Sequence, residues 1–258
     1  MPEEQQIPGE LLNRIARFGR VYFLDTVTST NDYAFSLSGK QEPAIVIARN
    51  QTKGRGRFRR HWFASEGSLI SSILLFPQPG TFAPPAVTQV AGLALCRAIE
   101  QLIASFPQNP LLPRPVLRWP NDVLVNEKKV AGILCEQKGR ALVVGIGVNV
   151  NQTTLPQNLP EAGSLRLSYQ QEFNHLILLE TTLSEFFSAL QRLEKDARSV
   201  WQDIRDRSAI IHRRVEIRTI LRRHIGTVLD IDDEGRVVLR TDSGRLLVFS
   251  AGQVRQLR

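Results

Sequence analysis

The sequence is poor in cysteine, has no long apolar run and has no basic segment at its N-terminus. Its two cysteines, Cys96 and Cys135, lack the neighbouring His or Cys spacing of a zinc site or a disulfide framework. Apolar stretches such as Leu69–Phe76 are far shorter than the roughly 20 residues that a membrane helix needs, so we expect no membrane span. The N-terminal MPEEQQIPGE is acidic where a secretory signal is basic. These absences favour a reducing, cytoplasmic location.

The composition is that of a globular protein with a basic excess. The 258 residues are 42% hydrophobic and 22% charged, and the formal net charge is +8. Such a charge favours anionic partners: nucleic acid, phosphate esters or an acidic protein. Six basic residues and no acidic residue lie between Arg49 and Arg60. This segment is therefore the first candidate site.

The hydrophobic pattern predicts an α+β protein in two parts. Apolar runs predict strands at 21–25, 44–49, 69–76, 116–119, 123–136 (with a turn at 126–129) and 141–150. Three- and four-residue spacing predicts helices at 30–38, 86–105 and 175–204, the last broken once. Short β-rich segments at 215–219, 225–231, 237–241 and 246–249 predict a small barrel. We expect a polar leader over 1–20, a large domain over 21–208 and a barrel over 209–258.

The basic segment KGRGRFRRHW, residues 53–62, has the composition of an anion-binding loop. Gly54 and Gly56 allow the backbone to approach a ligand closely, and the arginines supply permanent, planar donors for phosphate. The pattern is neither a Walker loop nor GxGxxG, because Arg59 stands at the third glycine position. A solvated turn or a nucleic-acid patch explains the charge equally well.

A second cluster, RWPNDVLVNEKKVAGILCE, covers residues 118–136. Arg118 at the end of a buried strand is costly unless it meets an anion. Asn121 and Asp122 are expected in a turn, and Gly132 within an apolar strand indicates close approach of a ligand or of backbone. Taken alone, the cluster is better explained as a strand–turn–strand with one snorkelling arginine.

Read in order, the motifs resemble those of the biotin protein ligase family. They are STN at 29–31, Gln51 before GRGR, Arg60-His61-Trp62, WPND at 119–122, GILCE at 132–136 and GIGVNVN at 145–151. The resemblance covers about Val21 to the C-terminus. It implies a mixed β-sheet flanked by helices, like class II aminoacyl-tRNA synthetases, followed by an SH3-like barrel. It also implies activation of biotin with ATP and Mg²⁺ to biotinyl-5′-AMP, and transfer to a lysine of the biotin carboxyl carrier protein of acetyl-CoA carboxylase.

The resemblance implies the site residues as well. Those expected to bind biotin are Ser29, Thr30, Asn31, Gln51, Gly54, Arg55, Gly56, Arg57, Trp62, Arg118 and Gly132. Those expected to bind the nucleotide are Arg57, Arg60, Trp62, Arg118, Asn121, Lys129 and Asn149, with Gly147 beside them. Arg55, Arg57 and Arg118 are expected to act in catalysis, and no metal ligand is assigned. A local capping or turn role is the alternative for each polar residue, and for Asn149 and Lys129 in particular.

One position departs from the family pattern. The basic residue that opens WPND is usually lysine, whereas this chain has Arg118. The planar guanidinium of arginine and the compact ammonium of lysine are not interchangeable. We therefore expect Arg118 to bridge the biotin carboxylate and the α-phosphate through two nitrogens. Octanoyltransferase relatives use a catalytic cysteine, but neither Cys96 nor Cys135 has a matching motif, and we assign them no catalytic role.

Two rival functions remain at this stage. A lipoate-type protein ligase shares the architecture, and a nucleic-acid-binding module explains the charge and predicts steep salt dependence. Some family members carry an N-terminal DNA-binding domain and act as repressors. Residues 1–20 are too few for that domain, so we expect no sequence-specific DNA binding. Homodimerisation through a sheet edge is known in the family and is left open by the sequence.

Overall fold

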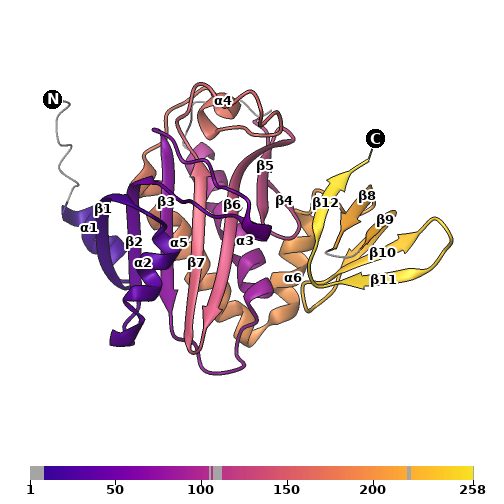
Figure 1. Ribbon diagram of the computed structural model, residues 1–258, viewed down its shortest axis with the longest axis horizontal. Helices are drawn as coiled ribbons and strands as arrows, with labels where there is room; N and C mark the ends of the chain where they lie inside the picture. Colours follow the sequence, from indigo (N-terminus) through magenta and orange to yellow (C-terminus); the bar gives the residue numbers. More distant parts are fainter. Residues whose placement is uncertain (1–8, 105, 107–111, 220–221, 258) are drawn as a thin grey trace.

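The computed structural model describes residues 9–104, 106, 112–219 and 222–257. It contains one seven-stranded sheet and one five-stranded sheet, with helices packed on the larger one (Figure 1). The helices are α1 (Gly9–Ala16), α2 (Thr30–Ser36), α3 (Pro84–Ala104), α4 (Leu165–Tyr169), α5 (His175–Lys195) and α6 (Ala197–Asp206), with short 3₁₀ turns at Ser38–Lys40 and Arg57–Arg59.

The large sheet is mixed, as predicted. Its strands are β1 (Arg20–Val27), β2 (Ala44–Gln51), β3 (Ser68–Leu75), β4 (Val116–Arg118), β5 (Asp122–Val125), β6 (Lys128–Lys138) and β7 (Ala141–Asn149). The order is β1-β2-β3-β7-β6-β5-β4, and β1 and β2 are parallel while the other pairs are antiparallel. The turn expected over 126–129 is tighter: Asn126 and Glu127 both have positive φ, and Val125 pairs directly with Lys128.

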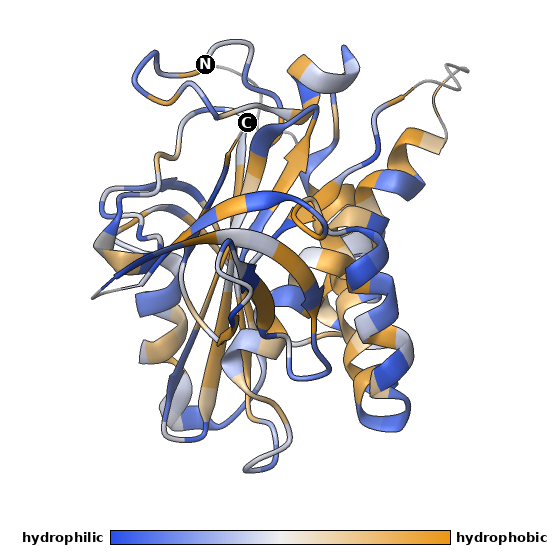
Figure 2. Ribbon diagram, turned by 90° about the vertical axis from the view of Figure 1, so that its right-hand side faces the viewer, coloured by the Kyte–Doolittle hydropathy of each residue, from blue (hydrophilic) through white to orange (hydrophobic). Residues whose placement is uncertain are grey.

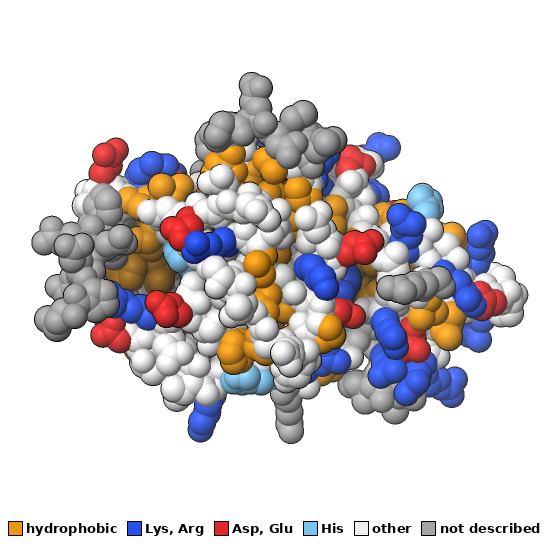
Figure 3. Space-filling view, turned by 90° about the horizontal axis from the view of Figure 1, so that it is seen from above, with side chains coloured by type: hydrophobic (Ala, Val, Ile, Leu, Met, Phe, Trp, Pro, Cys, Tyr) orange, Lys and Arg blue, Asp and Glu red, His pale blue; other side chains and the backbone are white. Residues whose placement is uncertain are grey.

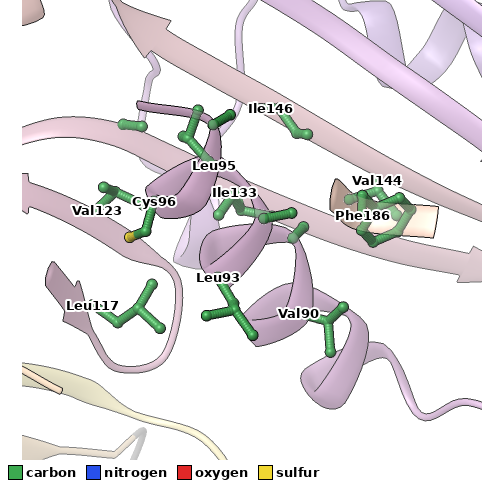
Figure 4. Packing of buried hydrophobic residues seen from close by; sticks show 14 of the residues in the cluster. Val90, Leu93, Leu95, Cys96, Leu117, Val123, Ile133, Val144, Ile146 and Phe186 are labelled. Carbon is green, nitrogen blue, oxygen red and sulfur yellow. The ribbon is translucent and has the colours of Figure 1, made fainter. Parts of the chain in front are cut away.

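Both faces of the large sheet are covered, which explains its continuous apolar strands. On β2, Ile45 and Ile47 join the cluster under α3 and α5, whereas Val46 joins Ala34 of α2 on the other face. Figure 2 shows the sheet between helices on both sides. Figure 4 shows side chains of α3 packed among Ile133 and Val144 of the sheet. The alternating inward and outward side chains therefore bury a core on each side.

The expectation that no segment could span a membrane is wrong by the criterion of length and composition. Helix α3 is long and apolar enough, although 67% of its most apolar window is buried inside the protein. Residues such as Val90, Leu93 and Ile99 of this helix are fully buried. The helix is the centre of the core, where apolar residues on all sides are expected. Ser105, the predicted end of this helix, lies outside the described residues.

Helix α1 packs on the large domain through both apolar and charged residues. Leu11 and Ile15 are buried in the main cluster. Arg14 and Arg17 both pair with the buried Glu180 of α5, at 2.6 and 2.8 Å. The two arginines supply the compensation that a buried carboxylate needs. The division at residue 20 between leader and large domain stays a prediction.

The predicted break in the helical region lies at Asp196. Helix α5 ends there and α6 begins, and the Asp196 carboxylate caps α6 by accepting from the Ser199 amide at 3.2 Å. The short helix α4 was not predicted from the sequence. Its cap is Ser164, whose hydroxyl accepts from the Leu167 amide at 3.1 Å.

The C-terminal sheet has one strand more than predicted. Its strands are β8 (Arg214–Arg218), β9 (Arg223–Ile231), β10 (Val237–Thr241), β11 (Leu246–Phe249) and β12 (Gln253–Gln256). They are antiparallel in the order β11-β10-β9-β8-β12. Among the described residues β11 does not pair with β12, so the sheet is open and the expected closed barrel is not found. Strand β12 was missed because its alternation of polar residues gives no apolar signal.

The two sheets are held together by the turn between β9 and β10. The carbonyl oxygen of Gly235 accepts from Gln89 Nε2 at 2.8 Å and from Trp119 Nε1 at 2.9 Å. Gln89 lies on α3, and Trp119 belongs to the turn after β4 whose Trp119–Pro120 bond is cis. Arg205 of α6 adds ion pairs to Asp230 and Asp233. The C-terminal sheet thus contacts the WPND segment directly.

Candidate active site

A cavity of about 560 Å³ lies where the 53–62 loop, β6, β7 and the C-terminal sheet meet. Its lining brings together all predicted site residues except one: Ser29, Thr30, Asn31, Gln51, Arg55, Gly56, Arg57, Arg60, Trp62, Arg118, Asn121, Lys129, Gly132, Gly147 and Asn149. The exception is Gly54, which belongs to the 53–62 loop but is buried against Trp62 and Gln51. A Cβ there would lie 2.7 Å from the Trp62 carbonyl oxygen and 3.1 Å from Gln51 Nε2, so glycine permits the loop to pack.

One end of the cavity is buried and polar but neutral. Ser29 is the N-cap of α2, yet its side chain makes no capping bond, so its hydroxyl faces the cavity without that local role. Gln51 Oε1 accepts from the Thr30 amide at 2.7 Å and contacts the Thr30 hydroxyl at 3.1 Å. Neutral donors and acceptors of this kind suit a neutral head group with several polar atoms.

Two further residues, the neutral Ser72 and the charged Glu136, lie behind this neutral end and contact its lining residues, and sequence reasoning missed both. The Ser72 hydroxyl lies 2.8 Å from Thr30 Oγ1 and 2.7 Å from Asn31 Oδ1. Asn31 Nδ2 donates to Glu136 Oε2 at 2.7 Å. The available signals were the serine pair inside the otherwise apolar LISSILLF strand and the glutamate that ends GILCE. Neither signal identifies a partner without the fold.

Gly132 and Gly147 form the floor of the cavity, beneath the indole ring of Trp62. A Cβ at Gly147 would lie 2.5 Å from Trp62 Cε2, and one at Gly132 would lie 3.0 Å from Trp62 Cζ3. Only glycine therefore lets the Trp62 ring lie flat on β6 and β7. Lys129 Nζ lies 5.6 Å from the ring centroid. Trp62 Nε1 is buried without a hydrogen-bond partner among the described residues, so it is an unused donor on a residue that lines the cavity.

At the opposite end, Arg118 is paired rather than snorkelling. Its side chain is 17% exposed, its Nη2 lies 3.0 Å from Asp122 Oδ2, and its Nη1 lies 3.1 Å from Glu161 Oε2. Lys129 Nζ reaches the other Asp122 oxygen at 2.6 Å. The anion that the sequence required for Arg118 is thus supplied within the protein. Glu161 belongs to the polar 151–163 stretch and was not predicted as a site residue.

Arg57 differs from Arg118 because no carboxylate pairs with it among the described residues. Its guanidinium lies 3.5 Å from the Gly252 carbonyl oxygen and 5.2 Å from the Phe58 ring centroid. Burial lowers the pKa of Arg57 from its ordinary value, although arginine stays protonated. A partly desolvated cation without a counter-ion is the group in this cavity best suited to receive an external anion.

Arg55, by contrast, has its charge compensated. It forms a two-bond ion pair with Asp32 of α2 and lies 3.4 Å from Glu136 of β6. The hydrogen bond to Arg55 lowers the pKa of Asp32, and the same bond raises the pKa of Arg55. This geometry anchors the 53–62 loop to the large domain. A direct role of Arg55 on a reacting anion stays a prediction.

The remaining predicted residues donate hydrogen bonds to segments distant in the chain. Arg60 Nη2 donates to Gln253 Oε1 of β12 at 2.7 Å. Asn121 Nδ2 donates to the Ile133 carbonyl at 3.0 Å, and Asn149 Nδ2 donates to the Gly163 carbonyl at 2.9 Å. The two amides thus each join a neighbouring segment to the wall of the cavity, and their role toward a nucleotide stays a prediction.

The C-terminal sheet also contributes to the cavity, which the sequence did not predict. Its lining residues are Glu216, Arg218, Gly252, Gln253, Val254 and Arg255. Figure 3 shows basic and acidic side chains beside each other on the upper face of the molecule, with hydrophobic side chains between them.

Neither cysteine has the properties of a nucleophile. Both thiols are free. Burial raises the pKa of Cys135 to about 12 and holds the pKa of Cys96 still further above its ordinary value. Because the thiolate is the reactive form, both side chains are inert near neutral pH. This is in line with the absence of a cysteine motif.

Comparison with known proteins matches both parts of the chain. Residues 22–152 match the biotin/lipoate A/B protein ligase family, and residues 210–254 match the biotin protein ligase C-terminal domain. These matches define the class as biotin and lipoate protein ligases. A biotin–[acetyl-CoA-carboxylase] ligase of Paracoccus denitrificans is 33% identical over 86% of this chain and 95% of its own length. The chain belongs to the biotin protein ligase family.

Other relatives agree with this assignment. The bifunctional ligase/repressor BirA of Bacillus subtilis is 29% identical over 95% of this chain and 79% of its own length. The solved structure of the Aquifex aeolicus biotin protein ligase in complex with biotin and ATP has a TM-score of 0.80 and 26% sequence identity. It covers 92% of this chain and 99% of its own.

Proposed function

We propose that this protein is an ATP-dependent biotin protein ligase that forms biotinyl-5′-AMP and transfers the biotinyl group to a lysine of a biotin carboxyl carrier protein. One observation carries the proposal: a single cavity has a neutral polar end at Ser29, Thr30 and Gln51 and a cationic end at Arg57 and Arg118. The neutral end suits the ureido ring of biotin, and the cationic end suits its carboxylate and the α-phosphate of ATP.

The reaction has two displacements. A biotin carboxylate oxygen attacks the α-phosphorus of ATP, the bond to the bridging oxygen breaks, and pyrophosphate leaves. The lysine amine of the carrier then attacks the carbonyl carbon of the mixed anhydride, loses its proton, and AMP leaves. No side chain becomes covalently modified, so the enzyme works by positioning two anions, compensating their charge and excluding water.

At the cationic end, the guanidinium groups of Arg57 and Arg118 have different roles in binding the two anions. Arg57 has no carboxylate partner and so accepts an incoming anion without losing an existing ion pair. Arg118 is held by Asp122 and Glu161, and it contacts the ligand by exchanging the more exposed Glu161 for it. The buried Nε1 of Trp62 adds a neutral donor between them.

Mg²⁺ enters as the counter-ion of the nucleotide. The described residues hold no group of three or more His, Cys, Asp or Glu side chains that could bind a metal ion. Magnesium is commonly held by one or two carboxylates together with substrate phosphates. Asp122 is the more buried carboxylate beside the cationic end, and it would supply such a contact once nucleotide is present.

The 53–62 loop would then act as a cover over the bound adenylate. It is closed on itself by bonds between Gly56 and Arg60 and between Trp62 and Gly54, and Arg60 ties it to Gln253. We expect biotin with ATP to protect this arginine-rich loop from trypsin. Unchanged cleavage of the loop in the presence of both ligands would contradict the cover.

One incubation tests the function. Purified protein is mixed with biotin, ATP, Mg²⁺ and a carrier domain, and the carrier mass is measured with the acceptor lysine present or replaced by arginine. We expect the mass of biotin on the lysine form alone. A gain of the lipoyl mass when lipoate replaces biotin would favour the lipoate alternative. Dependence of activity on a carrier from acetyl-CoA carboxylase identifies the partner, and cell fractionation tests the proposed cytoplasmic location.

A further inference from the structure

Glu136 lies where β6 passes the neutral end of the cavity, and its carboxylate contacts two different parts of the site. Its Oε2 accepts from Asn31 Nδ2 at 2.7 Å and lies 3.4 Å from Arg55 Nη2. Asn31 belongs to the polar end and Arg55 to the 53–62 loop. The side chain is 31% exposed, so this charge is partly shielded from water. A charge-assisted hydrogen bond in such a place is stronger than a neutral one.

The carboxylate fixes which way the Asn31 amide points. Asn31 Nδ2 donates to Glu136 and lies 3.3 Å from the Leu134 carbonyl oxygen, so both neighbours on that side are acceptors. Asn31 Oδ1 must then face Ser72. A Cβ at Gly145 would overlap with this oxygen, so the amide fits only because the residue beneath it is glycine. Rotation of the amide would set its oxygen against a carboxylate.

This orientation determines the hydrogen bonds of the next hydroxyl groups. Because Asn31 Oδ1 can only accept, the single hydroxyl hydrogen of Ser72 is directed to it at 2.7 Å. Ser72 Oγ then has no hydrogen left for Thr30 and offers it only a lone pair. The Thr30 hydrogen goes to Ser72 or to Gln51 Oε1, and both are acceptors. In either case Thr30 Oγ1 presents lone pairs, not a hydrogen, to a ligand in the cavity.

We propose that Glu136 is a positioning residue that sets the hydrogen-bond polarity of the head-group site through Asn31, Ser72 and Thr30, and that ties the 53–62 loop to that site through Arg55. The inference rests on the proposed function, since the acceptor at Thr30 would select an N–H group of the ureido ring. Asp32 provides the comparison, because its carboxylate also holds Arg55 but, among the described residues, forms no hydrogen bond with the Asn31 side chain.

The test is biotin binding by isothermal titration calorimetry without ATP. We expect Glu136→Gln, which keeps the shape but removes the charge, to weaken biotin binding about tenfold, the scale of one charge-assisted hydrogen bond. Asp32→Asn, which removes the other carboxylate that holds Arg55, should speed tryptic cleavage of the 53–62 loop and weaken biotin binding less than Glu136→Gln does. Glu42→Gln, at an exposed carboxylate before β2, is the matched control and should change neither.

A second readout does not depend on how much protein is folded. Biotin methylated at either ureido nitrogen lacks one N–H group, and wild-type protein should bind one of the two analogues much more weakly than biotin. The Kd of the weaker-binding analogue divided by the Kd of the other analogue should fall about tenfold in Glu136→Gln. In steady state this variant should raise KM for biotin and leave kcat within about twofold.

The interaction through Asn31 is tested by combining variants. In an Asn31→Ala background, Glu136→Gln should cause no further loss of biotin affinity. Wild-type affinity and wild-type discrimination in Glu136→Gln, or full additivity with Asn31→Ala, would overturn the inference while leaving the ligase function intact. Wild-type protein that binds no biotin at all would instead overturn the proposed function, and the inference with it.

Discussion

At the scale of single residues, Arg118 shows how one substitution changes an anion site. A lysine has one nitrogen to offer, whereas the Arg118 guanidinium pairs with Asp122 and Glu161 through two different nitrogens. The Arg118 guanidinium therefore stays paired with Asp122 when it releases Glu161. This geometry keeps a cation at the same place in the cavity and explains how arginine can stand where the family usually has lysine.

Removal of this cation should impair the first half-reaction. We expect Arg118→Ala to slow pyrophosphate release by about 100-fold, because a charge that compensates the displacement is lost and Asp122 and Glu161 are left to repel the incoming anions. The measurement is biotin-dependent pyrophosphate release at saturating ATP. Near-normal release would remove Arg118 from the mechanism, whereas unfolding of the variant is excluded by thermal denaturation.

Glu161 competes with a ligand anion for Arg118, so its removal should strengthen ligand binding. Glu161 is 68% exposed, and its ion pair with Arg118 must open for a ligand anion to bind. We expect Glu161→Gln to lower KM for biotin or ATP by about threefold, since exposed ion pairs contribute about 0.2–1 kcal/mol. If Glu161 instead holds the nucleotide's magnesium, KM for ATP will rise, and steady-state kinetics at varied Mg²⁺ separates the two outcomes.

At the scale of elements, the 53–62 loop is held both by the ion pairs of Arg55 and by the packing of the Trp62 ring on the glycines of β6 and β7. Asp32 on α2 is its main anchor through Arg55. The pKa of Asp32 is lowered from its ordinary value of 3.8, chiefly by the hydrogen bond from Arg55. A lowered pKa in the folded state means that the ion pair contributes to stability above the unfolded pKa and that this contribution is lost as the pH falls.

The pH dependence follows from that sign. We expect Asp32→Asn to be less stable than wild type near pH 7, and the difference to shrink as the pH falls below about 4. The partial exposure of both side chains keeps the effect small. Thermal unfolding of both proteins between pH 3 and pH 7 measures it. A difference that persists unchanged at pH 3 would show that the anchor does not depend on the charge of Asp32.

Elements also show what the sequence could predict. Apolar periodicity predicted the strands of the large sheet and the long helices. Continuous or alternating apolar residues indicate a strand, and apolar residues three or four apart indicate a helix with one face on the core. This periodicity missed β12 and α4, which consist largely of polar or mixed residues and are fixed by neighbouring segments. The site was predicted where motifs are local, as in STN and GRGR. Ser72, Glu136 and Glu161 were missed because their roles come from residues far away in the chain.

At the scale of the whole molecule, the C-terminal sheet is part of the active site. Arg60 and Arg57 of the basic loop contact Gln253 and Gly252 of this sheet. The β9–β10 turn contacts the WPND segment on the opposite side through the Gly235 carbonyl. The sequence predicted the turn but not its contact, because a DDEG turn is equally common on an open surface.

A substitution at Gly235 in the β9–β10 turn tests the packing of the C-terminal sheet on the large domain, whereas one in the next turn tests turn formation alone. Gly235 has φ +75°, and a Cβ there would overlap with Gln89 Nε2 and lie 2.7 Å from the Trp201 ring. We expect Gly235→Ala to cost roughly 2–3 kcal/mol in free energy of unfolding, from strain and overpacking together. Gly244→Ala, in the next turn at φ +82° with nothing within 4 Å, is the control and should cost only about 1 kcal/mol.

The same pair of variants tests whether docking supports catalysis. Because the Gly235 carbonyl accepts from Trp119, displacement of the turn should move the residues on either side, Arg118 and Asn121, and lower the rate of pyrophosphate release. Gly244→Ala should leave that rate unchanged. Urea denaturation and the pyrophosphate assay on the folded variants measure the two effects separately. Equal losses of stability and activity in both variants would show that the β9–β10 turn has no special coupling to the active site.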